Sequence, residues 1–173
     1  VDTPPLSVDF LMDFATEVFV AKVKSIEAGV WNTRNGDKPP KGVKNGPRFN
    51  PGIVTPINLQ VDTTLLGGAG PGAIRVVNPG GTTDCVEHNV SNAPVLEKGK
   101  TYVFFLQPSS DAEGVKKPEL PQVIAAWPVL ADGSVETAVE GVLPLNDVQA
   151  LVDNPVPPPV EPEPTPAGTN NPG

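Results

Sequence analysis

The sequence predicts a mainly β protein, and three observations lead to this expectation. Proline and glycine are abundant, with 23 Pro and 17 Gly in 173 residues, as is typical of chains with many turns. Several runs alternate between apolar and polar side chains, which is the pattern of strands with one buried face. The densest apolar run, residues 100–108, is apolar at both parities and is bounded by Gly99 and Pro108. We therefore expect a sheet with this run as its central strand.

A short helix is expected before the first strand. Ser7 is a suitable N-cap, and Asp9 lies in the first turn, where an acidic side chain is favourable. Phe10, Leu11 and Phe14 are spaced to form one apolar face, so we expect this helix to close one end of the core. Residues 16–26 then have the pattern of a strand that is apolar on both faces at first and polar on one face later.

Two further strands precede the central one. Residues 57–65 alternate cleanly and predict a strand with one wet face, and residues 74–77 predict its neighbour. The glycine-rich residues 67–72 connect the two. This connection does not fit a phosphate-binding loop, because Pro71 lacks an N–H group and a strand follows instead of a helix.

The second half of the chain predicts a strand, a hairpin and a closing helix. Residues 123–130 are apolar enough for a strand, and the turn at residues 131–134 leads into a short strand at 135–137. Asn146 is expected to be the N-cap of a helix that stops before residues 154–155.

Two segments are expected to lie outside the sheet and to contact partners. The long loop at residues 31–52 carries five cations against Asp37, namely Arg34, Lys38, Lys41, Lys44 and Arg48. A loop of this length is either functional or a solvated hairpin tip, and both interpretations remain open. Residues 154–173 contain eight Pro and no aromatic residue, which predicts an extended, mobile, polyproline II-like tail after a single domain at 1–153. Pro157, Pro158 and Pro159 are its candidate partner-binding residues.

Charge and hydropathy limit the partners and the compartment. The formal net charge of −8 argues against nucleic acid, because phosphate binding needs a basic surface. No apolar run approaches the roughly 18 residues that span a bilayer. The opening residues 1–5 are similar to a mature end left after removal of an export signal. We therefore expect an extracytoplasmic protein that is secreted, periplasmic or on the cell surface.

One short segment gathers groups that could carry chemistry, namely Asp84, Cys85, Glu87 and His88. These side chains could offer ligands to copper or zinc, but the chain has no second Cys or His to complete a site. The alternative is a polar loop in which Cys85 behaves as a small apolar residue. No known hydrolase signature surrounds Cys85 or His88, so we expect neither an enzyme nor a bound cofactor.

The order and texture of the strands support a resemblance to a known class. The short helix, the strand at 15–23, the alternating strand that ends at 65–67 and the run at 98–106 are similar to small secreted bacterial proteins with a netrin- or TIMP-like OB barrel. The resemblance implies a closed or partly open barrel of five to six strands, with short N- and C-terminal helices, used as a binding platform. The protease inhibition of that class needs an N-terminal Cys, and this chain has Val1 and one Cys.

The functional hypothesis is a non-enzymatic, exported cell-envelope protein. It would be an accessory or binding subunit of a larger cell-surface or membrane-associated protein assembly, contacted through the basic loop and the Pro-rich tail. One alternative is a protease-inhibitor-like or small-ligand-binding module that acts through two long loops, expected at residues 33–52 and 78–94. The other is a metal carrier that uses Cys85 and His88.

Overall fold

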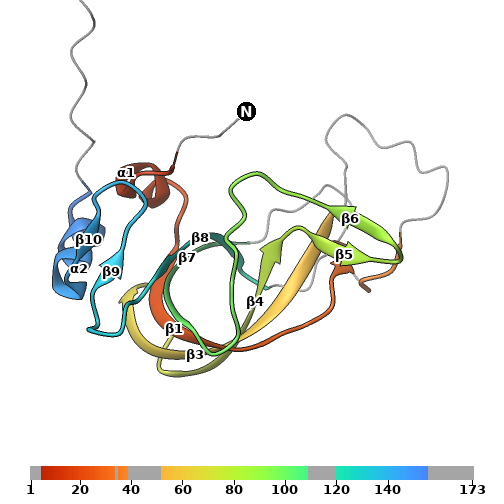
Figure 1. Cartoon of the computed structure of the whole chain (residues 1–173), viewed down its shortest axis with the longest axis horizontal. Coiled ribbons are helices and arrows are strands. Elements are labelled where there is room, and N and C mark those ends of the chain that lie inside the picture. The colour runs from red at the N-terminus through yellow and green to blue at the C-terminus, as the bar shows by residue number, and fades with distance from the viewer. Residues whose placement is uncertain (1–4, 34, 39–51, 109–119, 156–173) are drawn as a thin grey trace, which may run out of the picture.

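The computed structural model describes residues 5–33, 35–38, 52–108 and 120–155. Strands curve around a common centre, two helices lie at one end, and a small hairpin lies at the other end (Figure 1). The expectation of a mainly β chain is confirmed, because strands make up most of the regular structure. Within the described residues, no helix combines the length and the apolar character needed to cross a bilayer.

The main sheet is mixed and has six strands. Their order across the sheet is β1 (Glu17–Ile26), β7 (Thr101–Gln107), β8 (Gln122–Pro128), β4 (Gly72–Pro79), β3 (Ile53–Leu66) and β2 (Val30–Trp31). β1 also pairs with β3. The strands β1, β7, β8, β4 and β3 are therefore paired in a closed ring. All pairs are antiparallel except β4 with β8, which is parallel and joined by the single residue pair Val77–Gln122.

The expectation of a buried central strand in the run at residues 100–108 is confirmed, with β7 at Thr101–Gln107. β7 lies between β1 and β8, and its residues 102–106 are all buried. Because successive side chains of a strand point to opposite faces, β7 contributes to two apolar clusters. Phe104 packs in the first, with Phe19 and Leu59. Phe105 packs in the second, where its ring centroid lies 4.6 Å from that of Trp127.

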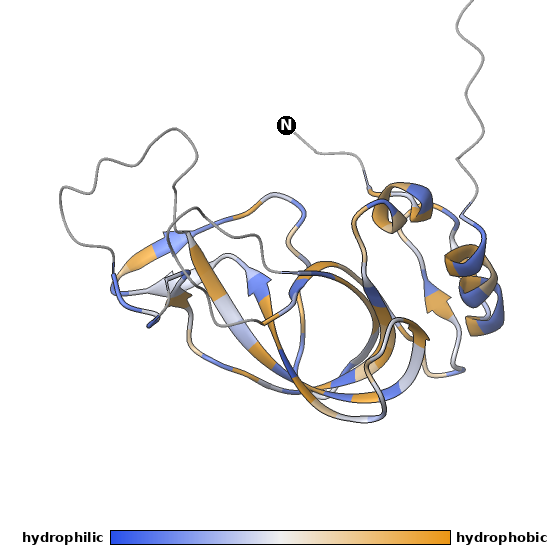
Figure 2. Cartoon of the chain, turned by 180° about the vertical axis from the view of Figure 1, so that it is seen from behind, coloured by the Kyte–Doolittle hydropathy of each residue, from blue (hydrophilic) through white to orange (hydrophobic). Residues whose placement is uncertain are grey.

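The two helices cover the second cluster. α1 (Val8–Met12) buries Val8 and Leu11, and α2 (Leu145–Asp153) buries Val148 and Val152, all of them in this cluster. The small sheet of β9 (Val135–Glu136) and β10 (Val142–Leu143) lies beside them, as Figure 1 shows. In Figure 2 the hydropathy of α2 changes from one side of the helix to the other, as expected for a helix with one buried face.

Two details of the helices correct the sequence-based expectations. The N-cap of α2 is Pro144 instead of Asn146. Proline suits this start because its φ is fixed near the helical value and the first N–H groups of a helix have no partner within it. The helix α1 ends at Met12, and Phe10 and Phe14 do not close the core, because they lie outside the face that carries Val8 and Leu11 and remain about half exposed.

The expectation of a long loop at residues 78–94 was wrong over its first half. This stretch forms a hairpin of β5 (Gly81–Thr83) and β6 (Val86–His88). The turn residues Asp84 and Cys85 have φ values of 49° and 61°. Two successive residues in the left-handed region are typical of the tight turns that match the twist of paired strands.

Candidate functional site

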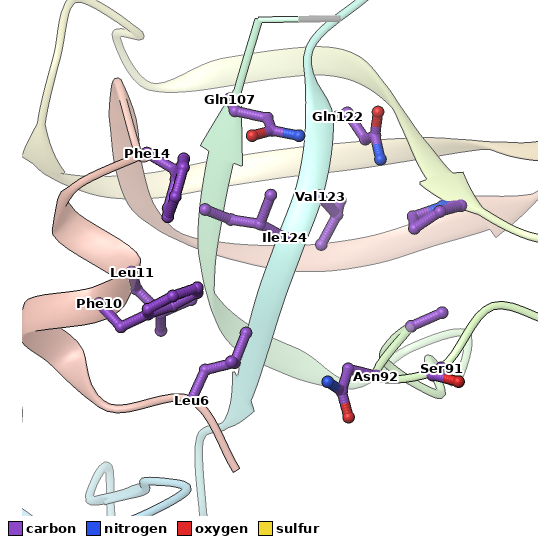
Figure 3. Close-up of a pocket in the computed structure, with 12 residues that line it drawn as sticks. Leu6, Phe10, Leu11, Phe14, Ser91, Asn92, Gln107, Gln122, Val123 and Ile124 are labelled. Atoms are coloured by element: carbon purple, nitrogen blue, oxygen red, sulfur yellow. The ribbon is translucent and has the colours of Figure 1, made fainter. Parts of the chain in front are cut away.

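A hollow in the described part of the chain lies between α1 and β8. Its volume is about 420 Å³. Figure 3 shows Phe10 and Leu11 of α1, with Phe14 of the turn that follows it, on one side, Ser91 and Asn92 on the other, and Val123 and Ile124 of β8 between them. The full lining is Leu6, Phe10, Leu11, Phe14, Pro79, Ser91, Asn92, Ala93, Gln107, Gln122, Val123 and Ile124. A cleft lined mainly by apolar side chains with a few polar groups is the usual form of a binding site.

The wall formed by α1 carries an exposed aromatic pair. Phe10 is 46% exposed and Phe14 is 51% exposed, and their ring centroids lie 5.1 Å apart. Phe10 lies in α1 and Phe14 in the turn that follows it, and both rings are on the outer side, while Val8 and Leu11 occupy the buried side of the helix. Two neighbouring aromatic rings in water beside a hollow are a feature of surfaces that receive a ligand.

A second hollow continues the first along β8. Its volume is about 190 Å³, and it shares Leu6, Asn92 and Ile124 with the larger one. Together the two hollows, here named the β8 groove, are lined by six consecutive residues of β8, 122–127. Successive side chains of a strand point to opposite faces, so a groove that touches all six lies along the edge of the strand. At this edge the only residue pair to β4 within the described chain is Val77–Gln122.

The wall opposite α1 is held by the end of β4. The side chain of Asn78 donates a hydrogen bond from Nδ2 to the carbonyl oxygen of Pro94, 2.9 Å away. Pro94 and Asn92 line the groove, so this bond ties the wall to the sheet. The other amide atom, Oδ1 of Asn78, is buried and has no hydrogen-bond partner among the described residues. A buried polar atom without a partner costs free energy, which makes this wall the less satisfied side of the groove.

The groove is electrically neutral. No Asp, Glu, Lys or Arg lines either hollow within the described residues, although the whole chain has 20 acidic and 12 basic residues. The polar side chains are a hydroxyl and three amides, those of Ser91, Asn92, Gln107 and Gln122. Gln107 and Gln122 are paired across β7 and β8, which places both amides at one end of the groove (Figure 3). Burying a charge in such a place is costly, so the groove suits an uncharged ligand with hydrogen-bonding groups.

The residues predicted to carry chemistry lie elsewhere, on the hairpin at the opposite end of the molecule (Figure 1). Asp84 accepts a hydrogen bond at Oδ2 from Nε1 of Trp31, at 3.1 Å. His88 accepts one at Nδ1 from the backbone N–H of Ile53, also at 3.1 Å, so the neutral ring carries its hydrogen on Nε2. Cys85 is a free, exposed thiol at the turn, and Glu87 is exposed on β6.

These four residues are near one another in the chain but do not form one site. Their polar atoms are directed to different partners, Asp84 to Trp31 and His88 to the main chain of β3. Among the residues that the structure describes, no group of three or more His, Cys, Asp and Glu side chains is placed to hold a metal ion. Two of the four candidates, Asp84 and His88, therefore have a structural role, since their hydrogen bonds attach the hairpin to neighbouring strands.

Of the predicted partner-binding residues, the structure describes one. The Nζ of Lys38 lies 5.9 Å from the centre of the Trp31 ring, within the range of a cation–π contact. The other basic-loop candidates, Arg34, Lys41, Lys44 and Arg48, lie outside the described residues. So do the tail candidates Pro157, Pro158 and Pro159.

The sequence-based reasoning missed the groove. Its residues come from six separated places in the chain, and each one alone looks structural. One signal was available in the sequence: each of two apolar strands has a glutamine at one end, Gln107 and Gln122. The other was Phe14, a third apolar residue of the expected first helix. Comparisons of the chain with protein-family models, curated proteins and solved structures find no match.

Proposed function

We propose that this protein is an exported, non-enzymatic binding subunit that holds an extended, uncharged peptide segment of a partner in the β8 groove. The observation that carries the proposal is the lining of the groove by six consecutive residues of one strand, with no charged side chain among the lining residues that the structure describes. A peptide laid along this edge would meet main-chain groups of β8, the aromatic pair of α1 and the three amides. Apolar burial would supply affinity, and the amides would fix the direction of the peptide.

The same proposal includes an OB-like barrel as the platform. The ring of pairings from β1 through β7, β8, β4 and β3 back to β1, with β4 and β8 as its one parallel pair, supports this interpretation. Barrels of this type are partly open, and a single residue pair between β4 and β8 leaves such an opening beside the groove. The basic loop and the Pro-rich tail would add contacts to the rest of the assembly.

The separation of the groove from the reactive side chains favours binding over catalysis. The only thiol and the only imidazole of the chain, Cys85 and His88, are on the hairpin and not in the lining of the groove. A nucleophile and its base must lie within hydrogen-bonding distance of the reacting group. The groove offers amides and a hydroxyl, which recognise a peptide without transforming it.

The test is a selection followed by a titration. Uncharged hexapeptides are selected for binding to the purified full chain, and the affinity of the best is measured for the native protein and for two variants. Phe14→Glu places a charge in the groove and should weaken binding at least tenfold. Val142→Glu places the same charge on a side chain that is 57% exposed and lies outside the groove, and it should leave the affinity unchanged.

The site of binding is read independently from amide chemical shifts in NMR spectra of the titrated protein. The largest shifts are expected at residues 91–93 and 122–127. Equal affinities for the native protein and Phe14→Glu, or shifts concentrated on the β5–β6 hairpin, would overturn the proposal.

A further inference from the structure

We infer that Asn89 is a site of N-linked glycosylation, at which an oligosaccharide is transferred from a lipid diphosphate carrier to the amide nitrogen of the side chain. The juxtaposition that carries this inference is an acceptor motif, Asn89-Val90-Ser91, in an exposed segment that belongs to no helix or strand. The inference rests on the export that is part of the function proposed above, because this transfer takes place on the extracytoplasmic side of a membrane. It does not rest on peptide binding in the groove.

The motif occurs once in this chain. Glycosyl transfer to an asparagine requires Ser or Thr two residues later and a residue other than Pro between them. Of all the asparagines in the sequence, Asn89 is the only one that meets both requirements. Asn78 fails because Pro79 follows it directly. Asn92 fails because the residue two positions later is Pro94, which has no hydroxyl group.

The fold places the acceptor groups on the outside of the molecule. The strand β6 ends at His88, and Asn89 and Ser91 are both exposed in the segment that follows. Exposed and partly buried residues alternate from Glu87 to Ser91, as expected for an extended chain with one side toward the protein. Glu87, Asn89 and Ser91 therefore share the exposed side, where an enzyme can reach all three.

The acceptor side chains are not engaged elsewhere. Neither Asn89 nor Ser91 has a hydrogen-bond partner for its side chain among the described residues. The chain turns directly after the motif, where Asn92 has a φ of 65° and the N–H of Ala93 donates to the carbonyl oxygen of Val90 at 3.2 Å. A sugar attached to Asn89 would therefore break no hydrogen bond of the described structure, and it would leave this turn intact.

The transfer is a substitution at the first carbon of the sugar, C1, and it needs no oxidant or reductant. Nδ2 of Asn89 forms a bond to C1, and the bond from C1 to the phosphate oxygen breaks. The diphosphate carrier leaves with the electron pair of that bond, and Nδ2 gives up one proton. An amide nitrogen is a weak nucleophile because its lone pair is delocalised, so a separate transferase must activate it.

Two neighbours of Asn89 supply the groups that such an enzyme recognises. The hydroxyl of Ser91 is the part of the motif that every transferase of this kind requires. Glu87 supplies an acidic residue two positions before the asparagine, which the bacterial transferases require in addition. The segment therefore suits a bacterial transferase as well as one that needs only the hydroxyl, and both use a lipid-linked oligosaccharide.

The experiment isolates the native protein from its source, records the cell fraction in which it is found, and analyses it by mass spectrometry. Trypsin should release residues 76–98 as one peptide, which contains Asn78, Asn89 and Asn92. We expect the mass of this peptide to be increased by that of an oligosaccharide. Fragmentation of the peptide should assign the added mass to Asn89.

Variants expressed in the same source test the recognition of the site. Asn89→Gln and Ser91→Ala should each abolish the modification, whereas Ser91→Thr is the matched control and should retain it, because the hydroxyl is kept. Glu87→Gln distinguishes the two kinds of enzyme: loss of the sugar assigns the transfer to the bacterial kind, and retention assigns it to the kind that needs only the hydroxyl. Asn89 lines neither hollow, so Asn89→Gln should leave the affinity for the selected hexapeptides unchanged.

The outcomes separate this inference from the proposed function. An extracytoplasmic protein with unmodified Asn89 would overturn the inference and leave the proposed function standing. Recovery from the cytoplasm without the sugar would overturn the proposed export and the inference with it. A sugar that persists in Ser91→Ala, or that fragmentation places on Asn78 or Asn92, would overturn the assignment to this motif. Failure of the hexapeptides to bind would overturn the proposed function alone.

Discussion

The two ends of this molecule are held by different kinds of interaction. At the hairpin end, directed hydrogen bonds join β5 and β6 to the main sheet: Ile53 donates to His88, Trp31 to Asp84, and Thr55 to the carbonyl oxygen of Gly80. At the helical end, α1 and α2 are held mainly by apolar packing, with one hydrogen bond from Nε2 of Gln149 to the carbonyl oxygen of Leu65, and Phe10 and Phe14 remain about half exposed. The polar groups of the hairpin end are paired within the molecule, whereas the helical end retains exposed apolar surface on which a ligand can pack.

This difference explains why the reactive side chains and the β8 groove are at separate places. A hydrogen bond uses the atoms that chemistry or metal binding would need, as at Asp84 and His88. Apolar packing is not directional, and a helix of five residues has too few positions to bury all of its apolar side chains. The substitutions that lower the free energy of unfolding most should therefore differ in kind: truncation of buried apolar side chains at the helical end, and loss of close contacts or hydrogen bonds at the hairpin end.

The largest effect is expected from Leu11→Ala at the helical end. Leu11 is 1% exposed, and its truncation leaves a cavity between α1 and the second cluster, so the free energy of unfolding should fall by about 2–5 kcal/mol. Phe14→Ala, in the turn after the helix, removes a larger side chain that is half exposed, and it should cost about 0.5 kcal/mol or less. Urea denaturation of both variants measures the contrast. Similar losses would mean that Phe14 has a structural role that its exposure does not show.

The next effect tests the close packing of the hairpin end through Gly81→Ala. The φ of Gly81 is 137°, and an added Cβ would lie 2.4 Å from Oγ1 of Thr55, so both the backbone and the contact oppose a side chain. We expect a loss of about 2–3 kcal/mol in the free energy of unfolding. Gly68→Ala is the control, because a Cβ there meets nothing within 4 Å, and its stability should be unchanged or slightly higher. A neutral Gly81→Ala would show that the hairpin is loosely seated.

A smaller effect is expected from His88→Ala, which removes the acceptor of the Ile53 N–H group. An unpaired, partly buried donor costs about 1–2 kcal/mol, and this loss should be seen in thermal or urea unfolding. Glu87→Ala is the neighbouring control on the exposed side of β6 and should change the stability by less than about 0.5 kcal/mol. Hydrogen exchange at Ile53 offers a local readout, since it should accelerate in His88→Ala alone.

The sequence was most informative where burial decides the structure. The apolar run at 101–107 predicted β7 and its two buried faces, and the alternation at 57–65 predicted the core of β3, because strand periodicity is written directly in side-chain polarity. The hairpin of β5 and β6 was missed because its strands have three residues each and its turn uses Asp84 and Cys85 without the usual Asn-Gly pair.

The candidate site could not be predicted in the same way, because it depends on tertiary placement. The spacing of Phe10, Leu11 and Phe14 fits one apolar face, yet only Leu11 is buried. Which of these three side chains is buried depends on where β8 and residues 91–94 lie in the fold. No local sequence pattern contains that information. The pairing of Gln107 with Gln122 likewise depends on the register between β7 and β8.

The smallest effect is expected between the two ends, at the exposed ion pair of Glu27 and Arg75. Arg75 donates from Nε and Nη2 to the two carboxylate oxygens at 3.0 and 2.7 Å, and Asn58 donates a third hydrogen bond at 2.8 Å. The bonds from Arg75, and then that from Asn58, lower the pKa of the Glu27 carboxyl. Both side chains are more than a third exposed, so solvent screening limits the contribution to about 0.2–1 kcal/mol.

The lowered pKa fixes the sign of a pH effect. A carboxyl with a lower pKa in the folded state stabilises the fold above its unfolded pKa of about 4.3, and this contribution is lost as the pH falls below that value. Glu27→Gln should therefore be less stable than the native protein at pH 7, and the difference should disappear near pH 2 in urea denaturation. Added salt at pH 7 should reduce the same difference. A difference in stability that persists in acid would mean that Glu27 acts through packing instead of charge. The Glu27–Arg75 region would then be held by packing, as the helical end is.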